Sequence, residues 1–393
     1  MALSPVFLCA PKRTAIGSFH GALADVPAPD LGAHVIRAVL ESAGVAPDSI
    51  QEVILGCVLM AGCGQAPARQ AALGAGLPNT VQAMTINKVC SSGLKAVMLA
   101  ADAVRLGRAD AVVAGGVENM SRAPYLLPQM RSGARLGHTL AEDSVIKDAL
   151  WDVYNDLHMG NCAELCAREY GFSREAQDAY AIESYRRATT AIAEGAFREE
   201  ITPFEVRRGR ATETFAVDEE PGRGIPEKMP SLRPVFQKDG TVTAANASSI
   251  NDGAAALLVC SEAYVRQQQL EPFAQILGQG VNAQAPEWFT TAPVGAVRRA
   301  LDDASLTVDR IDLFEINEAF AAVALACQKD LQIPHEKLNV RGGAVALGHP
   351  VGASGARILT TLLHAMKQRA VKRGAVGICN GGGEATAMVV ERV

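Results

Sequence analysis

The sequence lacks the signatures of several classes of protein. Its apolar runs all fall short of the roughly 20 residues that cross a bilayer as a helix, so we expect no membrane-spanning segment. Neither sign of charge dominates, because 37 Lys and Arg face 42 Asp and Glu. We therefore expect no nucleic-acid partner. The N-terminal residues carry no charged region followed by a long apolar stretch, which argues against a signal peptide and for a cytoplasmic location.

Cysteine pairing is also missing. The chain has an odd number of cysteines and no C-x2-C pair of the kind that binds zinc. We therefore expect a reducing compartment and free thiols, most of which serve as packing residues. The nine cysteines stand at positions 9, 57, 63, 90, 162, 166, 260, 327 and 379.

The features that are present predict a large α/β protein. The 393 residues are 49% hydrophobic and include 36 glycines, a composition that excludes disorder and can bury a substantial core. Strand and helix patterns alternate along the first 120 residues and again in the C-terminal third. In the first of these regions, Asp30 is expected to cap a helix that stops at Gly44.

An internal repeat relates the two regions. Identical residues recur at a constant spacing, and Ser92-Gly93 recurs as Ser354-Gly355. Several matches at nearly one offset indicate a duplication, so we predict two similar α/β halves packed face to face. The matching pairs are Leu40 with Leu301, Ala43 with Ala304, Asp48 with Asp309, and Ile50 with Ile311.

The pattern changes between the halves. Helical runs and a charged, proline-bearing segment replace the alternation, as in insertions that form lids or ligand-binding surfaces. We therefore expect a first half at residues 1–120 plus 241–270, an inserted loop domain at 121–240, and a second half at 271–393.

Cys90 is the first candidate for chemistry. It follows a predicted strand and precedes a predicted helix, so its sulfur is expected at the positive end of the helix dipole, where a thiol pKa is lowered. A buried structural cysteine is the alternative. The Ser91-Ser92-Gly93 run after it favours a reactive thiol, because small residues let a substrate approach the backbone.

His349 and Cys379 are the other two candidates. His349 stands in the second half close to the position that Cys90 holds in the first, so a pseudo-twofold arrangement would bring the two together as an activated thiol pair. Cys379 precedes Asn380 and three glycines. A turn of this kind can cradle an oxyanion, and a thiol beside it could act as acid or base. The glycine-rich turn lacks the G-x-G-x-x-G spacing of a dinucleotide site.

Several separated motifs resemble those of the thiolases, and the resemblance covers essentially the whole chain. It is closest to the acetoacetyl-CoA thiolase (acetyl-CoA C-acetyltransferase) branch. The family motifs are NKVCSSGLKA (87–96), NEAF (317–320), GGA (342–344), GHP (348–350), GASG (352–355) and CNGGG (379–383). The branch motifs are DVYN (152–155), HMG (158–160), QDAYAI (177–182) and TVTAANAS (241–248).

The resemblance implies a fold and a mechanism. The fold is a duplicated α-β-α-β-α layered structure with an inserted loop domain. The reaction is a ping-pong condensation of two acetyl-CoA to acetoacetyl-CoA and CoA, or its reversal. Cys90 would be the acylated nucleophile, His349 its activator and Cys379 the acid/base at the α-carbon. Asn317, through a water, would form one oxyanion hole with His349, and the amides of Cys90 and Gly381 would form the other.

The resemblance also implies how substrates are held. Coenzyme A thioesters would be the substrates and no cofactor would be permanently bound. The side chains implied in binding them are His158, Met159, Arg223, Lys228, Ser248 and Phe289. In some relatives a potassium ion is held by a tyrosine and backbone carbonyls, which correspond here to Tyr185, Ala244, Ala245, Ala247 and Val345. Homotetramers are usual among the short-chain members.

Two positions depart from the family pattern. Arg341 replaces a usual asparagine, with no expected effect on the chemistry. Phe289-Thr290 replaces Phe-Pro of relatives that handle 2-methyl-branched substrates, so the resemblance does not imply that this chain accepts that substrate class.

Other functions are weighed against this one. A broader-chain 3-ketoacyl-CoA thiolase of β-oxidation is the main alternative. Ketoacyl and hydroxymethylglutaryl synthases are disfavoured by the Asn317 and Cys379 pair, and a non-catalytic acyl-CoA-binding protein is disfavoured because all four catalytic positions are filled. A cysteine hydrolase would need water as the acceptor in place of CoA.

Overall fold

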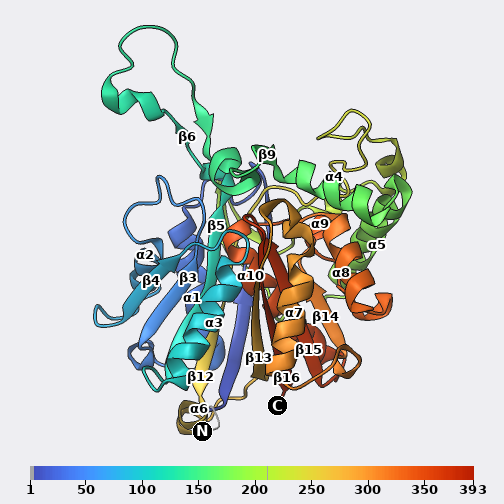
Figure 1. Ribbon diagram of the computed structural model, residues 1–393. Coiled ribbons are helices and arrows are strands. Elements are labelled where there is room, and N and C mark those ends of the chain that lie inside the picture. Colours follow the sequence, from blue (N-terminus) through green and yellow to red (C-terminus); the bar gives the residue numbers. More distant parts are fainter. Residues whose placement is uncertain (1–3, 210) are drawn as a thin grey trace.

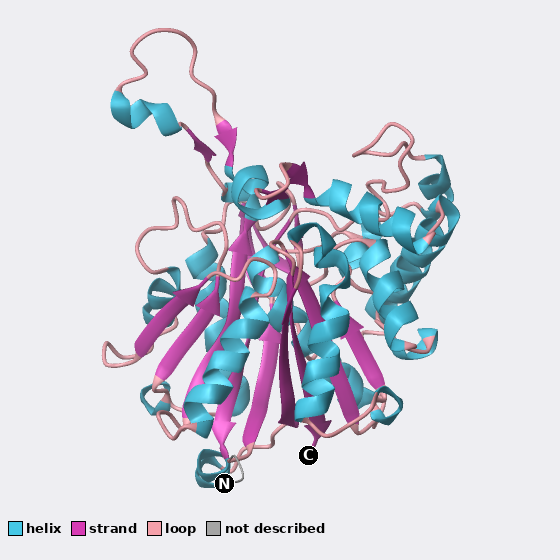
Figure 2. Cartoon of the chain, in the orientation of Figure 1, coloured by secondary structure: helices cyan, strands magenta, loops and turns pink. Residues whose placement is uncertain are grey.

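The computed structural model describes residues 4–209 and 211–393 (Figure 1). Helices lie on the faces of a large mixed sheet, and a smaller group of helices sits beside its upper end (Figure 2). The first half contains β1 (Val6–Arg13), β2 (Gly17–Ser18), α1 (Ala28–Ala43), β3 (Glu52–Gly56), α2 (Pro67–Gly74), β4 (Gln82–Ile86), α3 (Ser92–Arg105), β5 (Ala111–Asn119), β12 (Asn251–Ser261) and α6 (Glu262–Gln268). The second half contains β13 (Ala274–Ala283), α7 (Ala292–Asp303), β14 (Leu313–Ile316), α8 (Ala321–Leu331), α9 (Ala344–Leu347), α10 (Val351–Gln368), β15 (Arg373–Asn380) and β16 (Glu384–Arg392).

The strands of both halves form one sheet. Its order is β14-β15-β16-β13-β1-β12-β5-β3-β4, and β2 pairs with β12. The halves join where β1 pairs antiparallel with β13, with Phe7 opposite Gln275. This backbone pairing between the halves was not anticipated from the sequence.

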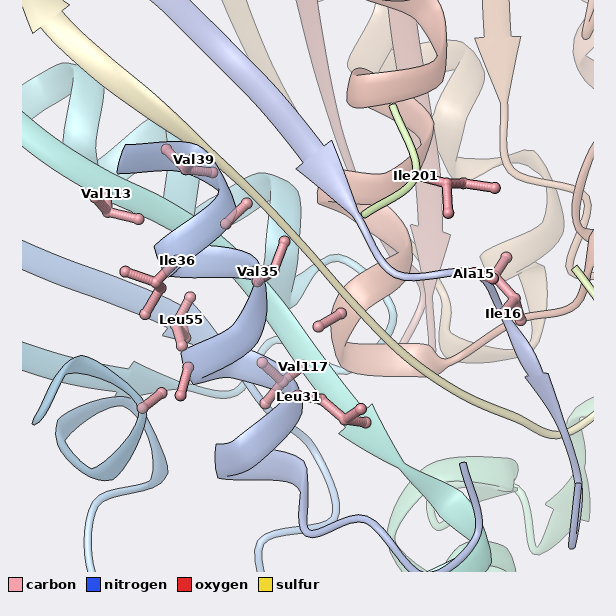
Figure 3. Close-up of a cluster of buried hydrophobic side chains, with 14 of the residues drawn as sticks. Ala15, Ile16, Leu31, Val35, Ile36, Val39, Leu55, Val113, Val117 and Ile201 are labelled. Carbon is pink, nitrogen blue, oxygen red and sulfur yellow. The ribbon is translucent and has the colours of Figure 1, made fainter. Parts of the chain in front are cut away.

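Buried side chains divide the molecule into layers. Val113 and Val117 of β5 pack with α1 on one face of the first half (Figure 3), whereas Val112 and Ala114 pack with α3 and α10 on the other. In β16, Met388 joins the α3 and α10 cluster while the next residue along, Val389, joins the cluster of α7. Because side chains alternate along a strand, α1 and α7 form outer layers and α3 with α10 forms the layer between the halves. The predicted layered α/β fold is confirmed.

The duplication is visible in the elements. Apart from β2, β4 and α6 of the first half and the short α9 of the second, each half runs strand, helix, strand, helix, central helix, strand and strand. The second half lacks a counterpart of β4 as a named strand, but Leu338 bridges Phe314 of β14 in parallel, as β4 pairs with β3. One local prediction is wrong: Asp30 is the third residue of α1, and Pro27 occupies its N-cap position. Pro27 has extended backbone and Gly44 ends the helix with φ of 67°.

The segment between β5 and β12 carries the inserted elements. Its two main helices are α4 (Met159–Tyr170) and α5 (Arg174–Ala193). Residues 124–143 extend away from the body of the molecule as an arm (Figure 1). The remaining strands of the segment are β6 (Tyr125–Leu126), β7 (Glu142–Asp143), β8 (Trp151–Asp152), β9 (Leu157–His158), β10 (Phe204–Arg208) and β11 (Ala211–Phe215).

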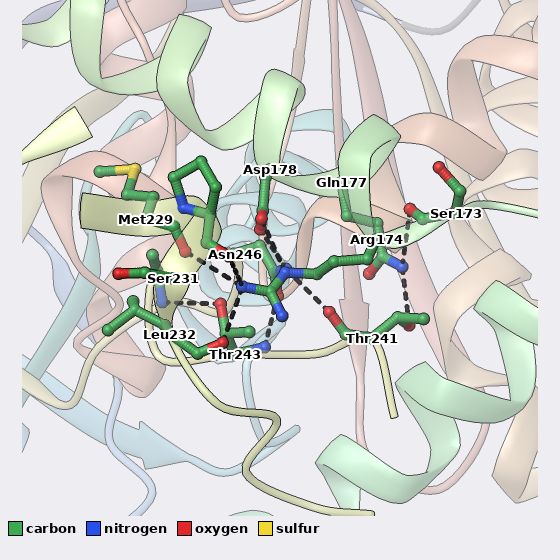
Figure 4. Close-up of polar contacts among 12 residues, drawn as sticks. Ser173, Arg174, Gln177, Asp178, Met229, Ser231, Leu232, Thr241, Thr243 and Asn246 are labelled. Carbon is green, nitrogen blue, oxygen red and sulfur yellow. Dashed lines mark hydrogen bonds and ion pairs between the residues drawn. The ribbon is translucent and has the colours of Figure 1, made fainter. Parts of the chain in front are cut away.

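Polar contacts fix this segment in place (Figure 4). The Arg174 guanidinium donates to Asp178 at 2.6 Å and to the carbonyls of Met229 and Leu232 at 3.0 and 2.9 Å. Asp178 in turn accepts from Asn246 at 2.9 Å. These bonds tie α5 to two loops that run beside the site described below. No helix among the described residues combines the length and apolarity that a bilayer crossing requires.

Candidate active site

Cys90 sits at a tight turn between β4 and α3. The turn places Val89 at φ of 46°, a left-handed conformation that is rare for a β-branched residue. The Ser92 hydroxyl donates to the Val89 carbonyl at 2.6 Å and accepts from the Lys88 amide at 2.8 Å. Because α3 begins at Ser92, Cys90 lies just before the N-terminus of that helix, as predicted.

A cavity of about 230 Å³ opens onto Cys90. It brings together side chains from both halves and from the inserted segment, and its walls are mostly apolar. Cys90, His158, Met159, Ala247, Ser248, Phe289, His349 and Gly381 are predicted residues that line it. Met120, Ile146, Ala149, Leu150, Phe236, Ser249, Ile250, Ala319, Phe320 and Val351 complete the lining.

The hydrogen bonds of His349 define its tautomer. The Ser354 hydroxyl lies 2.6 Å from Nδ1 of His349 and donates its own hydrogen to the Pro350 carbonyl at 2.8 Å. Ser354 must therefore accept from Nδ1–H, which leaves Nε2 as the unprotonated nitrogen. Burial, reinforced by the charge of Arg357, lowers the pKa of His349 to about 3. The imidazole is thus a neutral base with its lone pair on Nε2.

The thiol of Cys90 is protonated at rest. Burial raises its pKa to about 12, outweighing the backbone N–H groups of Gly381 and Cys90 itself, which bond to the sulfur and lower the pKa. The predicted lowering of this pKa by the helix terminus is therefore wrong. Removal of the sulfur from water destabilises the thiolate more than hydrogen bonds from the nearby amides stabilise it. A thiolate must form by transfer of the proton to a base.

Cys379 and Asn317 lie behind the cavity wall. Cys379 is the seventh residue of β15 and is fully buried. Burial, followed by the proximity of Cys90, raises the pKa of its thiol well above the usual value. The Asn317 amide nitrogen lies 3.5 Å from Nε2 of His349, and its Oδ1 atom is buried without a hydrogen-bond partner. An unpartnered amide oxygen at this depth marks a position for a hydrogen-bond donor.

His158 and Ser248 point specific groups at the cavity. Nδ1 of His158 accepts from the Gly160 amide at 3.0 Å, so the ring carries its proton on Nε2. The ring stacks on Phe236, with centroids 4.7 Å apart. The Ser248 hydroxyl donates to the Ala319 carbonyl at 2.9 Å, which leaves its oxygen free to accept from an N–H group.

The two predicted basic residues lie elsewhere. Arg223 ends the short helical turn η5 (Pro221–Arg223), and Lys228 lies in η6 (Pro226–Ser231). Both are exposed, and neither lines the cavity. Arg223 approaches Glu220 at 3.8 Å.

The residues of the predicted cation site are also placed. Tyr185 is buried, and burial together with Glu220 and Glu318 raises its pKa to about 12, so the hydroxyl stays neutral. The carbonyls of Ala244 and Ala245 accept no hydrogen bond from the described residues. Val345 donates its amide to Glu318 at 3.1 Å. A neutral hydroxyl and free carbonyls are the kinds of donor that suit a hard monovalent cation.

Sequence reasoning missed three residues that organise the site. Ser354 was noted as part of the repeat, yet its bond to His349 depends on helix geometry. Asn251 accepts from the His349 amide at 2.8 Å and gave no motif. Phe236 stacks on His158 from a loop that looked merely charged and proline-rich. The nine cysteines are all free, as predicted; eight of them are buried and Cys63 is partly exposed.

Two family models cover the chain. A model described as "Thiolase, N-terminal domain" matches residues 6–263, and one described as "Thiolase, C-terminal domain" matches residues 270–392.

Individual relatives match from end to end. Acetyl-CoA acetyltransferase IA of Candida tropicalis is 51% identical over 397 residues, covering 100% of this chain and 98% of the relative. Acetyl-CoA acetyltransferase 2 of Arabidopsis thaliana is 53% identical over 382 residues, covering 96% of this chain and 95% of the relative. The crystal structure of the Bacillus anthracis acetyl-CoA acetyltransferase has a TM-score of 0.97 at 41% identity, with 100% of both chains covered.

Proposed function

The chain belongs to the thiolase family, and from this premise we propose that Cys90 is the acylated nucleophile, His349 its base and Cys379 the acid/base at the α-carbon. The observation that carries the first two roles is the shared cavity, which is lined by both the Cys90 thiol and a neutral imidazole with its lone pair on Nε2. This is the arrangement that activates a thiol.

The activity is that of an acetyl-CoA C-acetyltransferase, an acyltransferase that condenses two acetyl-CoA to acetoacetyl-CoA and CoA or cleaves the product with CoA. Its substrates are coenzyme A thioesters. The direct test mixes purified protein with acetoacetyl-CoA and CoA and follows loss of the enolate absorbance. Cleavage that depends on CoA is expected, whereas loss that proceeds without CoA would indicate a hydrolase.

The first half-reaction begins at a neutral pair. As acetyl-CoA binds, the Cys90 proton moves to Nε2 of His349 and the sulfur attacks the thioester carbonyl. The negative charge on the carbonyl oxygen is met by the amides of Cys90 and Gly381, which already bond to the resting sulfur. The C–S bond to CoA then breaks and the Cys379 thiol gives its proton to the departing CoA thiolate, so that acetyl-Cys90, a Cys379 thiolate and His349 protonated on Nε2 remain.

The second half-reaction makes or breaks a carbon–carbon bond. In condensation the Cys379 thiolate takes a proton from the methyl group of a second acetyl-CoA, the enolate carbon attacks acetyl-Cys90, and the released Cys90 sulfur takes the proton from Nε2 of His349. A water held by Asn317, together with His349, would stabilise the enolate oxygen. In cleavage the protonated Cys379 returns its proton to the departing carbon. Its raised pKa suits this acidic role, and acetylation of Cys90 removes one cause of that rise.

The cavity lining supports a substrate-binding role for His158, Met159, Ser248 and Phe289. The Ser248 oxygen can accept from an amide of pantetheine, and Nε2–H of His158 can donate to a carbonyl. Phe289 and Phe320 lie against each other in the wall of a small cavity, which supports short acyl chains over the broad range of a β-oxidation thiolase. We assign Arg223 and Lys228 to the adenosine phosphates of CoA, because exposed cations outside the cavity are suited to the solvent-facing end of that molecule.

A potassium ion fits the residues predicted for it. Tyr185 and the carbonyls of Ala244, Ala245, Ala247 and Val345 would hold the ion, which would brace the loop that carries Ser248 against the cavity. Activity is expected to be higher in potassium than in sodium at equal ionic strength. Equal activity in the two salts would refute the proposed potassium site.

The surface supports a homotetramer. The outer edge of β4 has no strand partner among the described residues, and an open sheet edge favours pairing with another copy. The arm at 124–143 exposes Tyr125, Leu127, Met130, Leu136 and Leu140, more apolar surface than a monomer usually leaves in water. Two separate surfaces suit a dimer of dimers. Light scattering on the eluting protein would test this, and a monomer would contradict it.

We further propose that the chain divides as the repeat suggests, at 1–120 plus 241–270, 121–240 and 271–393, and that it works in the cytoplasm. The position of the inserted elements between β5 and β12 supports the division. Limited proteolysis would test it, since the first cuts are expected in the inserted segment and cuts within the layered halves would oppose it.

A further inference from the structure

Glu118 is a fully buried carboxylate that no step above uses. It is the eighth residue of β5, and its exposed fraction is 0%. No lysine or arginine among the described residues forms an ion pair with it. A buried charge without a cationic partner needs hydrogen-bond donors to stabilise it.

The donors come from two distant parts of the chain. The Val58 and Leu59 amides donate to the carboxylate at 3.0 and 3.1 Å, and the Gly352 amide donates at 2.9 Å. The Cys57 thiol lies 3.7 Å from Oε1. Burial raises the pKa of Glu118 to about 7, against the lowering effect of these amides. The carboxylate is ionised on the alkaline side of neutrality.

Gly352 connects this carboxylate to the base. It is the second residue of α10, so its amide is one of those that a helix leaves without an internal partner. Pro350, at the N-cap position, supplies no side-chain cap. Glu118, which lies on β5, therefore caps the N-terminus of α10 at Gly352. Gly352 is three residues after His349 and two residues before Ser354, whose hydroxyl orients the imidazole.

Val58 and Leu59 connect the same carboxylate to the nucleophile. They follow β3 and pack in one cluster with Cys90. The packing there is tight: a Cβ atom on Gly93 of α3 would lie 2.9 Å from the Gly352 carbonyl oxygen, and one on Gly116 would lie 2.0 Å from it. The N-termini of α3 and α10 are therefore in direct contact, with no room for a larger side chain between them. A shift of Gly352 would move His349 relative to Cys90.

We propose that Glu118 is a positioning residue whose carboxylate fastens the N-terminus of α10, and with it His349, to the part of the first half that supports Cys90. Its negative charge has a second effect, because it disfavours a thiolate at Cys90. Glu118 thereby adds to the effect of burial, which is the main reason that the thiol stays protonated until His349 takes the proton. The inference rests on the proposed roles of Cys90 and His349.

Two substitutions separate geometry from charge. Glu118→Gln keeps the length but removes the charge and turns N–H groups toward amide donors. Its kcat in thiolysis is expected to fall about 10- to 100-fold, as for a misplacement of about 1 Å, with KM for CoA within about twofold. Alkylation of Cys90 by iodoacetamide at pH 9 is expected to be about three- to tenfold faster, because the repelling charge is gone. Glu118→Asp keeps the charge but cannot reach all the donors, so kcat should fall without faster alkylation.

A matched control is Glu164→Gln. Glu164 is also a buried carboxylate, which accepts from the Thr241 and Val242 amides at 2.8 to 2.9 Å, and its loss should leave the alkylation rate of Cys90 unchanged. Peptide mass spectrometry reports the alkylation of Cys90 alone.

The result that overturns the proposal is Glu118→Gln with kcat within twofold of wild type, or with Cys90 no faster than wild type. If Glu118→Gln does not fold, Glu118→Asp decides, and a wild-type kcat in that variant overturns the proposal. Failure of the wild-type protein to form acetyl-Cys90 would instead refute the proposed function, because the alkylation rates report on Glu118 without turnover.

Discussion

Removal of the Ser354 hydroxyl tests the state of the catalytic base. In the intact protein this hydroxyl accepts from Nδ1–H of His349 and passes its own hydrogen to the Pro350 carbonyl. Ser354→Ala leaves Nδ1–H buried without an acceptor. The imidazole can escape that cost by moving its proton to Nε2, but that tautomer cannot take the proton of Cys90.

The size of the effect follows from the cost of an unpaired buried donor. Ser354 and His349 are 0% and 5% exposed, so water offers little compensation. An unsatisfied buried donor costs about 1–3 kcal/mol. At about 1.4 kcal/mol for each tenfold in rate, kcat is expected to fall about 5- to 150-fold.

Steady-state thiolysis of acetoacetyl-CoA provides the assay. KM for CoA should stay within about twofold, because Ser354 does not line the cavity. Ser42→Ala, on the exposed face of α1, is a control for handling and should match wild type. A Ser354→Ala variant that is folded and keeps kcat within twofold of wild type would refute the assigned tautomer.

Three further predictions follow from the structure. Cys379→Ser should still acquire an acetyl group at Cys90 but lose exchange of the α-proton of acetyl-CoA with solvent, measured by mass spectrometry in D₂O; retained exchange would remove Cys379 from its acid/base role. Since the pKa of His349 is lowered to about 3 and that of Cys90 raised to about 12, both are neutral between these limits, so the NMR signals of the His349 ring should show no titration with a midpoint near 6.5, and such a titration would contradict this. Gly355→Ala would place a Cβ atom 2.4 Å from the Leu94 amide nitrogen and should lower the free energy of unfolding, measured in urea, by about 1–3 kcal/mol. Gly222→Ala has open space around it, so its free energy of unfolding should stay within about 0.5 kcal/mol of wild type. Equal stability of the two variants would show that the central helices do not meet as described.

Local patterns predicted much of the architecture. Cys90 was placed between a strand and a helix from the residues on either side of it. The repeat that relates α3 to α10 was found by comparing two short local patterns. Side-chain alternation and turn residues define such features well. Asp30 shows the limit of this reasoning. Its side chain favours an N-cap position, but α1 begins two residues earlier, so that Pro27 is the N-cap residue and Asp30 lies in the first turn.

Burial and distant partners could not be predicted in the same way. The pKa of Cys90 depends on how much of the fold covers it, and the helix terminus alone suggested the opposite direction. Glu118 gains its role from residues 58, 59 and 352, which no motif connects. The basic residues Arg223 and Lys228 were assigned by resemblance, and their place outside the cavity depends on how the inserted loops fold.

The central claim is that Cys90 carries the acyl group. Incubation of the protein with acetyl-CoA, acid quenching and peptide mass spectrometry test this most directly. The account predicts one acetyl group on the peptide that contains Cys90, its removal on addition of CoA, and none in Cys90→Ser. An acetyl group on another residue that CoA can remove, or turnover without any acetyl-enzyme, would contradict it.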